Sequence, residues 1–172
     1  KYPTYEENLN KYHVLYLDMQ SFASSLDKEG KEYLSNFHEQ LTQELVENFP
    51  KAFKKEVKND FPKALKQVYS IYREKFIVLV DEWDYALRVY QNAKITEEYV
   101  DLLRSLFKDD ICANCFSLVY MTGILPIKRY DTESSLNNFD EFTMESPGKY
   151  AKYFGFTESE VKELCSEHNL SF

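Results

Sequence analysis

Two adjacent carboxylates, Asp81 and Glu82, are the residues whose type and position best suit chemistry. They follow the apolar run Phe76–Val80, which a parallel sheet would bury and hold rigid. An aspartate fixed at the edge of a sheet can bind Mg²⁺ directly or through water. A second carboxylate beside it can orient or deprotonate a water that attacks a phosphate. A buried strand followed by an acidic turn explains the same seven residues equally well.

Polar residues after a second apolar run, Phe116–Met121, could complete such a site. Thr122 stands where a polar residue can sense a nucleotide, although a strand-end threonine before a turn glycine is the simpler interpretation. Lys128 and Arg129 follow within reach of the same edge, where a cation neutralises charge that develops on a phosphate. On spacing alone, a solvated basic pair explains these two residues better.

Apolar runs alternate with helical periodicity along the chain, which predicts an α/β fold. Strands are expected at His13–Asp18, Phe76–Val80 and Phe116–Met121, with a short fourth strand at Phe139–Met144. Helices are expected at Leu34–Phe49, from the cap Asp60 to Tyr72, from Thr96 to Phe107, after Ser146-Pro147, and from the capping box of Thr157 and Glu160. Right-handed crossovers then predict a parallel, doubly wound sheet with helices on both faces.

The carboxyl ends of parallel strands meet at one edge of a sheet, and ligands bind there in doubly wound folds. Asp18, the Asp81-Glu82 pair and Thr122 would lie together on that edge. Because Gln20 follows closely, Asp18 is interpreted as a structural cap of the strand end rather than as a catalytic residue.

The composition of the 172 residues suits one folded domain, or a large piece of one. Apolar residues make up 44% and charged residues 29%, a balance that excludes a disordered chain. The net charge of −8 argues against sequence-blind binding to nucleic acid or to an anionic membrane, and no apolar run approaches the roughly 20 residues of a membrane span. The chain has three cysteines, an odd number whose spacing is not that of a disulfide framework, which indicates a reducing, cytoplasmic location. Cys112 and Cys115 lack a second ligand pair for zinc and are predicted to be core thiols.

A phosphate loop of the form G-x-x-x-x-G-K-[ST] does not occur in the sequence. The four glycines are Gly30, Gly123, Gly148 and Gly155, and none precedes Lys-Ser or Lys-Thr. Either the protein is not a nucleoside triphosphatase, or the loop precedes Lys1. Because the chain begins with lysine and stops just after a helical pattern, we expect a fragment.

Five segments spread over nearly the whole chain resemble one protein family, and they occur in the order in which that family has them. They are Tyr12–Phe22, Phe76–Asp84, Met121–Arg129, Ser134–Met144 and Tyr153–Cys165. Together they resemble the bacterial AAA-ATPase-like family. The resemblance implies a phosphate-loop NTPase domain of the ASCE type whose Walker A strand and loop precede this segment. Many members also carry a C-terminal nuclease domain of the PD-(D/E)xK type.

The resemblance implies an incomplete NTPase core at residues 1–145 and the start of a C-terminal, lid-like helical segment at 146–172. It implies ATP and Mg²⁺ as ligands and an effector domain as a partner in the full-length protein. Without the Walker A loop, the isolated segment is expected to be inactive.

The family's pattern also implies roles for individual residues. Asp81 would be the Walker B ligand of Mg²⁺, and Glu82 would activate the attacking water. Thr122 would be the sensor-like residue and Arg129 a catalytic cation, while Lys128 would bind the nucleotide.

The alternative is a non-catalytic interaction module on a degenerate NTPase fold, binding a partner through the helix Phe156–His168. Retention of Asp81 and Glu82 favours the ATPase, because a scaffold has no need for adjacent carboxylates at a sheet edge. A nuclease would need Asp…(Asp/Glu)-x-Lys on a strand pair, whereas Asp81-Glu82 is followed by Trp-Asp, so we discount it for this segment.

Overall fold

The computed structural model describes residues 4–53, 58–108, 110–127, 136, 138–153 and 155–172. The chain divides into two compact units, Lys1–Asn138 and Phe139–Phe172. The first unit contains the sheet and the residues that the sequence singles out for chemistry, so each unit is described by itself.

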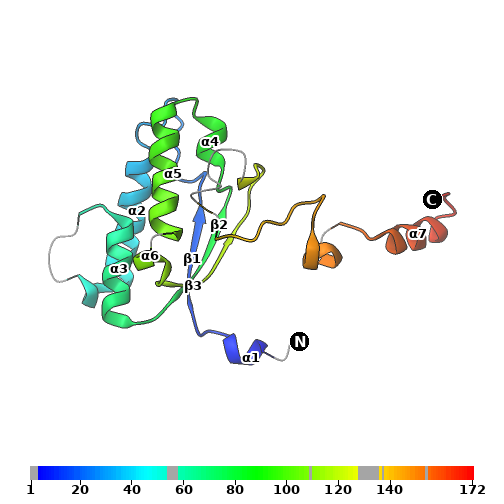
Figure 1. The fold of residues 1–172 in the computed structure, drawn as a ribbon, viewed down its shortest axis with the longest axis horizontal. Coiled ribbons are helices and arrows are strands. Elements are labelled where there is room, and N and C mark those ends of the chain that lie inside the picture. The colour runs from blue at the N-terminus through cyan, green and yellow to red at the C-terminus, as the bar shows by residue number, and fades with distance from the viewer. Residues whose placement is uncertain (1–3, 54–57, 109, 128–135, 137, 154) are drawn as a thin grey trace. The chain divides into compact units, whose positions relative to one another are not determined.

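The sheet has three parallel strands, β1 (His13–Asp18), β2 (Phe76–Asp81) and β3 (Phe116–Met121), in the order β1-β2-β3 (Figure 1). The sequence predicted all three strands. The register sets Asp18 opposite Asp81 and Val80 opposite Met121. The carboxyl ends therefore meet at one edge, which brings the polar residues after the strands together.

The main helices of this unit also lie close to their predicted positions. They are α2 (Tyr33–Asn48), α3 (Phe61–Tyr72) and α5 (Ala93–Phe107), and the short elements are α1 (Tyr5–Asn8), η1 (Pro50–Ala52), α4 (Tyr85–Val89) and α6 (Asp110–Ala113). Asp60 caps α3 as predicted, because its carboxylate accepts a hydrogen bond from the backbone N–H of Lys63 at 3.1 Å. Helix α5 begins before the predicted Thr96, because Asn92 accepts hydrogen bonds from the N–H groups of Lys94 and Ile95.

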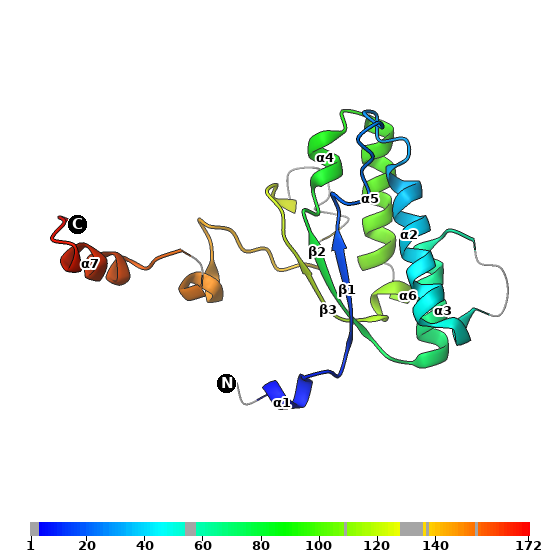
Figure 2. The ribbon, with the colours of Figure 1, turned by 180° about the vertical axis from the view of Figure 1, so that it is seen from behind.

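Helices α2, α3 and α5 all lie on the same face of the sheet (Figures 1 and 2). The opposite face exposes the side chains of Val14, Tyr16, Leu118 and Tyr120. The expectation of helices on both faces does not hold for the described part of this unit. Both crossovers move in one direction across the order β1-β2-β3, and right-handed connections in one direction place their helices on one face.

The core lies between that face and the helices. Tyr33 and Phe37 of α2, Leu65 of α3 and Tyr99 of α5 are almost completely buried there. Cys112 and Cys115 are buried, as predicted, and neither forms a disulfide. In the part of the chain that the structure describes, no helix has the length and apolar character needed to cross a membrane.

The second unit contains η4 (Gly148–Tyr153) and α7 (Glu158–Glu167). The predicted capping box is confirmed: the Thr157 hydroxyl accepts from the N–H of Glu160, and the Glu160 carboxylate accepts from the N–H of Thr157.

The strand predicted at Phe139–Met144 was wrong, because this segment has no strand. Thr143 and Ser146 exchange backbone hydrogen bonds of 3.1 and 3.2 Å, which close a turn instead of extending a ladder. The Phe142 ring packs edge-on against Tyr150 in the same unit, with 4.7 Å between the ring centroids.

Candidate active site

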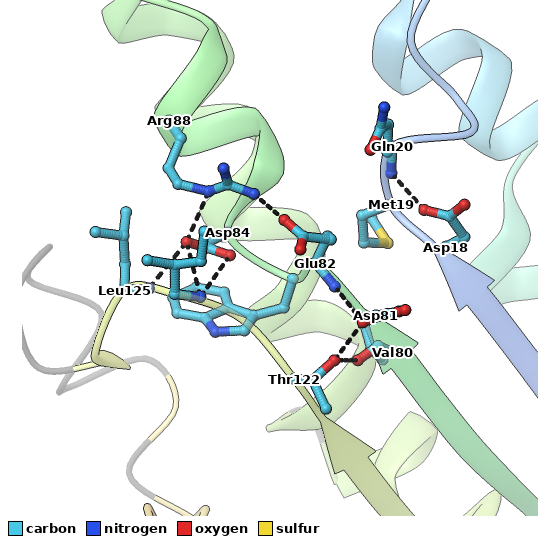
Figure 3. Close-up of polar contacts among 12 residues, drawn as sticks. Asp18, Met19, Gln20, Val80, Asp81, Glu82, Asp84, Arg88, Thr122 and Leu125 are labelled. Carbon is cyan, nitrogen blue, oxygen red and sulfur yellow. Dashed lines mark hydrogen bonds and ion pairs between the residues drawn. The ribbon is translucent and has the colours of Figure 1, made fainter. Parts of the chain in front are cut away.

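Asp81, at the end of β2, is the centre of the polar cluster at the carboxyl edge of the sheet. Its Oδ1 accepts hydrogen bonds from the Thr122 hydroxyl at 2.5 Å and from the Glu82 backbone N–H at 3.1 Å, and its Oδ2 accepts from the Tyr16 hydroxyl at 3.2 Å (Figure 3 draws the first two). The bond from Thr122 is the main reason that the pKa of Asp81 lies below its usual value, and the Tyr16 bond adds to it. The carboxylate is therefore ionised and held from two neighbouring strands.

Backbone hydrogen bonds fix the chain on both sides of Asp81. The N–H of Met19 donates to the carbonyl of Asp81 at 3.1 Å, and the N–H of Thr122 donates to the carbonyl of Val80 at 2.8 Å. The N–H of Trp83 donates in turn to the carbonyl of Thr122 at 3.0 Å. The ladder thus continues past the strand ends, so the side chains of the candidate site stand on a rigid edge.

Glu82 leaves the strand in the left-handed region, with a φ of 53°. A non-glycine residue rarely adopts this conformation, and here it turns the chain sharply from β2 toward α4. The Glu82 carboxylate forms an ion pair with the guanidinium of Arg88 on α4 (Figure 3). Glu82 is thus held by a side chain six residues away.

Asp84 is a fully buried carboxylate beside this ion pair. Its oxygens accept hydrogen bonds from the backbone N–H groups of Ile124 and Leu125, the latter at 2.9 Å. Arg88 Nε lies 2.9 Å from Asp84 Oδ2. A buried charge is tolerated where it is paired and hydrogen-bonded. Arg88 supplies the opposite charge to Asp84, and the two backbone N–H groups supply the hydrogen bonds.

A family model described as "Predicted AAA-ATPase" matches residues 1–132, which is more than half of the chain. The chain belongs to this family. Comparisons with curated proteins and with solved structures found no match. Membership in an AAA-ATPase-like family supports an ATPase-like domain and a nucleotide as its ligand.

In this AAA-ATPase-like chain, the strand ends bring together three of the predicted site residues, Asp81, Glu82 and Thr122. Asp18 lies opposite Asp81 in the register, and its Oδ1 accepts a hydrogen bond from the N–H of Gln20 at 3.0 Å, as a cap does. Lys128 and Arg129 lie outside the described residues.

The oxygen atoms of Asp81 and Thr122 would suit a Mg²⁺ ion whose other ligands are mainly water and phosphate. Within the described residues, no group of three or more His, Cys, Asp or Glu side chains could hold a metal ion. Mg²⁺ in nucleotide sites commonly keeps several waters and takes only one or two protein carboxylates. An ionised Asp81 next to the Thr122 hydroxyl meets that smaller requirement.

Sequence reasoning assigned no role to three residues of this cluster: Tyr16, Asp84 and Arg88. The spacing of Asp84 and Arg88, four residues apart, is a signal of an ion pair on one helix face. The contact of Tyr16 with Asp81 depends on the pairing of β1 with β2, which the sequence alone does not display.

Proposed function

We propose that this chain supplies the Mg²⁺-binding and water-activating side of an ATPase active site. The phosphate loop of that site would lie in another segment of the full-length protein. The observation that supports the proposal is the Asp81–Thr122 pair at the ends of adjacent parallel strands, with Glu82 beside it, in a chain of the predicted AAA-ATPase family.

Asp81 would be the protein ligand of Mg²⁺, in the role of a Walker B aspartate. Its lowered pKa keeps it ionised, and the hydroxyls of Thr122 and Tyr16 fix the direction of its two oxygens. When bound, Mg²⁺ would supply positive charge that offsets the negative charge developing on the phosphates.

Glu82 would accept a proton from the attacking water or orient that water, because it follows the metal ligand and stands partly exposed on the same edge. Thr122 would sense the terminal phosphate through its hydroxyl, which hydrogen-bonds to Asp81. By family resemblance, Lys128 would bind the phosphates and Arg129 would stabilise their charge in the transition state.

The test compares the 172-residue chain with the full-length protein in Mg²⁺-ATP thermal shift and phosphate-release assays. The proposal expects binding and turnover by the full-length protein and neither by the shorter chain. At 100 times the dissociation constant, ligand binding adds about 2.7 kcal/mol of stability.

Two substitutions with matched controls then assign the roles in the full-length protein. Glu82→Gln should keep Mg²⁺-ATP binding and lower kcat by about 10²–10⁴-fold, the usual contribution of a general base. Asp81→Asn should weaken the Mg²⁺-dependent part of binding. Glu98→Gln and Asp101→Asn on α5 also remove a paired carboxylate, and they should leave both readouts unchanged. A well-folded full-length protein without ATP binding would refute the proposal and favour the interaction module.

A further inference from the structure

We infer that Arg88 is a positioning residue that holds the Glu82 carboxylate in place for the attacking water, with the buried Asp84 as its anchor. The inference rests on the proposed function and adds a residue to its site. The contacts that carry it are the Glu82–Arg88 ion pair and the Arg88–Asp84 ion pair, which join three charged side chains in a row (Figure 3).

The anchor of this row is rigid. The side chain of Asp84 is 0% exposed, and its oxygens accept hydrogen bonds from two successive backbone N–H groups, those of Ile124 and Leu125. A buried carboxylate with these partners cannot change rotamer without leaving hydrogen bonds unsatisfied in the interior. Asp84 therefore presents Oδ2 to Arg88 at a fixed place.

Because Arg88 contacts both carboxylates, the fixed position of Asp84 restricts the position of Glu82. Its Nε lies 2.9 Å from Asp84 Oδ2, while Nη2 of the same guanidinium pairs with Glu82 Oε2. The guanidinium is planar, so fixing Nε also restricts where Nη2 can lie. Lysine carries a compact charge that cannot make the same two-sided contact.

The pair leaves Glu82 free to act on a water. The contact engages Oε2, and the structure gives Oε1 no hydrogen bond with any described residue. The side chain of Glu82 is 37% exposed, so without the ion pair it would sample several rotamers. A catalytic group displaced by about 1 Å can lower a rate by about 10²-fold, which is the scale of effect that such a positioning contact controls.

The anchor also connects Glu82 to the segment after β3. Asp84 binds the backbone of Ile124 and Leu125, which directly follow Thr122 and Gly123. The predicted water-activating residue and the loop of the predicted sensor thus share one buried carboxylate. A change of rotamer at Arg88 would disturb Glu82 while leaving the Asp81–Thr122 pair in place.

The test uses Arg88→Gln in the full-length protein. The glutamine Nε2 occupies about the same place along the side chain as the arginine Nε, so it can still donate to Asp84. It lacks the Nη2 that reaches Glu82. The inference expects kcat for ATP to fall by about 10–100-fold, with KM changed by less than about threefold. Arg88→Lys should recover little of the rate. Arg104→Gln, which removes an exposed arginine paired with Asp101, is the control and should leave kcat unchanged.

A double substitution separates positioning from a general structural role. If Arg88 acts through Glu82, the variant with both Glu82→Gln and Arg88→Gln should turn over no more slowly than Glu82→Gln alone, because residues that act as a unit are not additive. Multiplying losses would overturn the inference. An unchanged or raised kcat in Arg88→Gln would overturn it too.

The wild-type protein distinguishes failure of the inference from failure of the proposed function. If wild type hydrolyses ATP and Glu82→Gln does not, an active Arg88→Gln overturns the inference alone. If wild type shows no turnover, both are overturned. If Arg88→Gln does not fold, Arg88→Lys replaces it with the same expected loss of kcat, and full activity of Arg88→Lys overturns the inference.

Discussion

Replacing Gly123 with alanine tests the packing at the end of β3. A Cβ at Gly123 would lie 2.5 Å from Trp83 Cδ1 and 2.6 Å from Asp84 Oδ1. Trp83 is 3% exposed and Asp84 is 0% exposed, so neither side chain has room to move away. The loop must shift instead, which strains the hydrogen bonds from the N–H groups of Ile124 and Leu125 to Asp84.

Two effects set the size of the loss. Overpacking by one methyl group costs about 1–3 kcal/mol, and weakening a hydrogen bond to a charged group adds up to about 1.5–3 kcal/mol. We expect Gly123→Ala to lower the free energy of unfolding by about 3 kcal/mol, which corresponds to roughly 6–12 °C in Tm for a chain of this length.

The fluorescence of Trp83, the single tryptophan of the chain, reports urea unfolding at the site itself. Gly155→Ala is the control for a methyl group without overpacking: a Cβ there would meet no atom within 4 Å, and the backbone strain from its φ of 68° falls in the other unit, away from Trp83. If the urea midpoint of Gly123→Ala moved no further than that of Gly155→Ala, the close approach of the loop to Trp83 would be refuted.

Three further substitutions test hydrogen bonds that stabilise the first unit (His38 and Tyr99) and the second unit (Thr157). His38 Nδ1 accepts a hydrogen bond from the N–H of Phe61 at 3.2 Å, and burial lowers the pKa of His38 below 6.5. The contribution of His38 to the free energy of unfolding should therefore be full above about pH 6.5 and be lost as the pH drops through the lowered pKa. In His38→Gln, the urea midpoint should fall less over the same pH range. Tyr99→Phe leaves the carbonyl of Trp83 without the Tyr99 hydroxyl and should lower the free energy of unfolding by about 1–3 kcal/mol, and an unchanged urea midpoint would contradict this. Thr157→Ala removes the capping box of α7 at a cost of about 1 kcal/mol, so amide exchange in the first turn of α7 should speed up while the Trp83 transition stays in place.

The sequence predicted what local patterns determine. β1, β2 and β3 follow from short apolar runs, and the caps of α3 and α7 follow from Asp60 and Thr157, because each signal lies within a few residues of the feature it specifies. Once the strands are parallel, the meeting of Asp81 with Thr122 follows from topology alone.

The sequence did not predict features that depend on how segments far apart in the chain pack against one another. Phe139–Met144 is short and has three apolar residues, as strands often do, yet it forms a turn that packs on Tyr150. A strand needs a neighbour with which to share its ladder, and the pattern says nothing about whether one is present. The uncovered face with Val14 and Leu118 has the same origin, since the direction of the crossovers decides which face the helices cover.

Asp84 shows why supporting residues are harder to predict than the residues they support. Its donors are four residues ahead, at Arg88, and 40 and 41 residues ahead, at Ile124 and Leu125. Only the first of these separations is visible as a sequence period. The others exist because β2 and β3 are neighbours and their carboxyl ends turn toward each other. A carboxylate that directly ends a strand can be assigned to the edge of the sheet from sequence, whereas one that ties two strand ends together can be assigned only after the strand order is known.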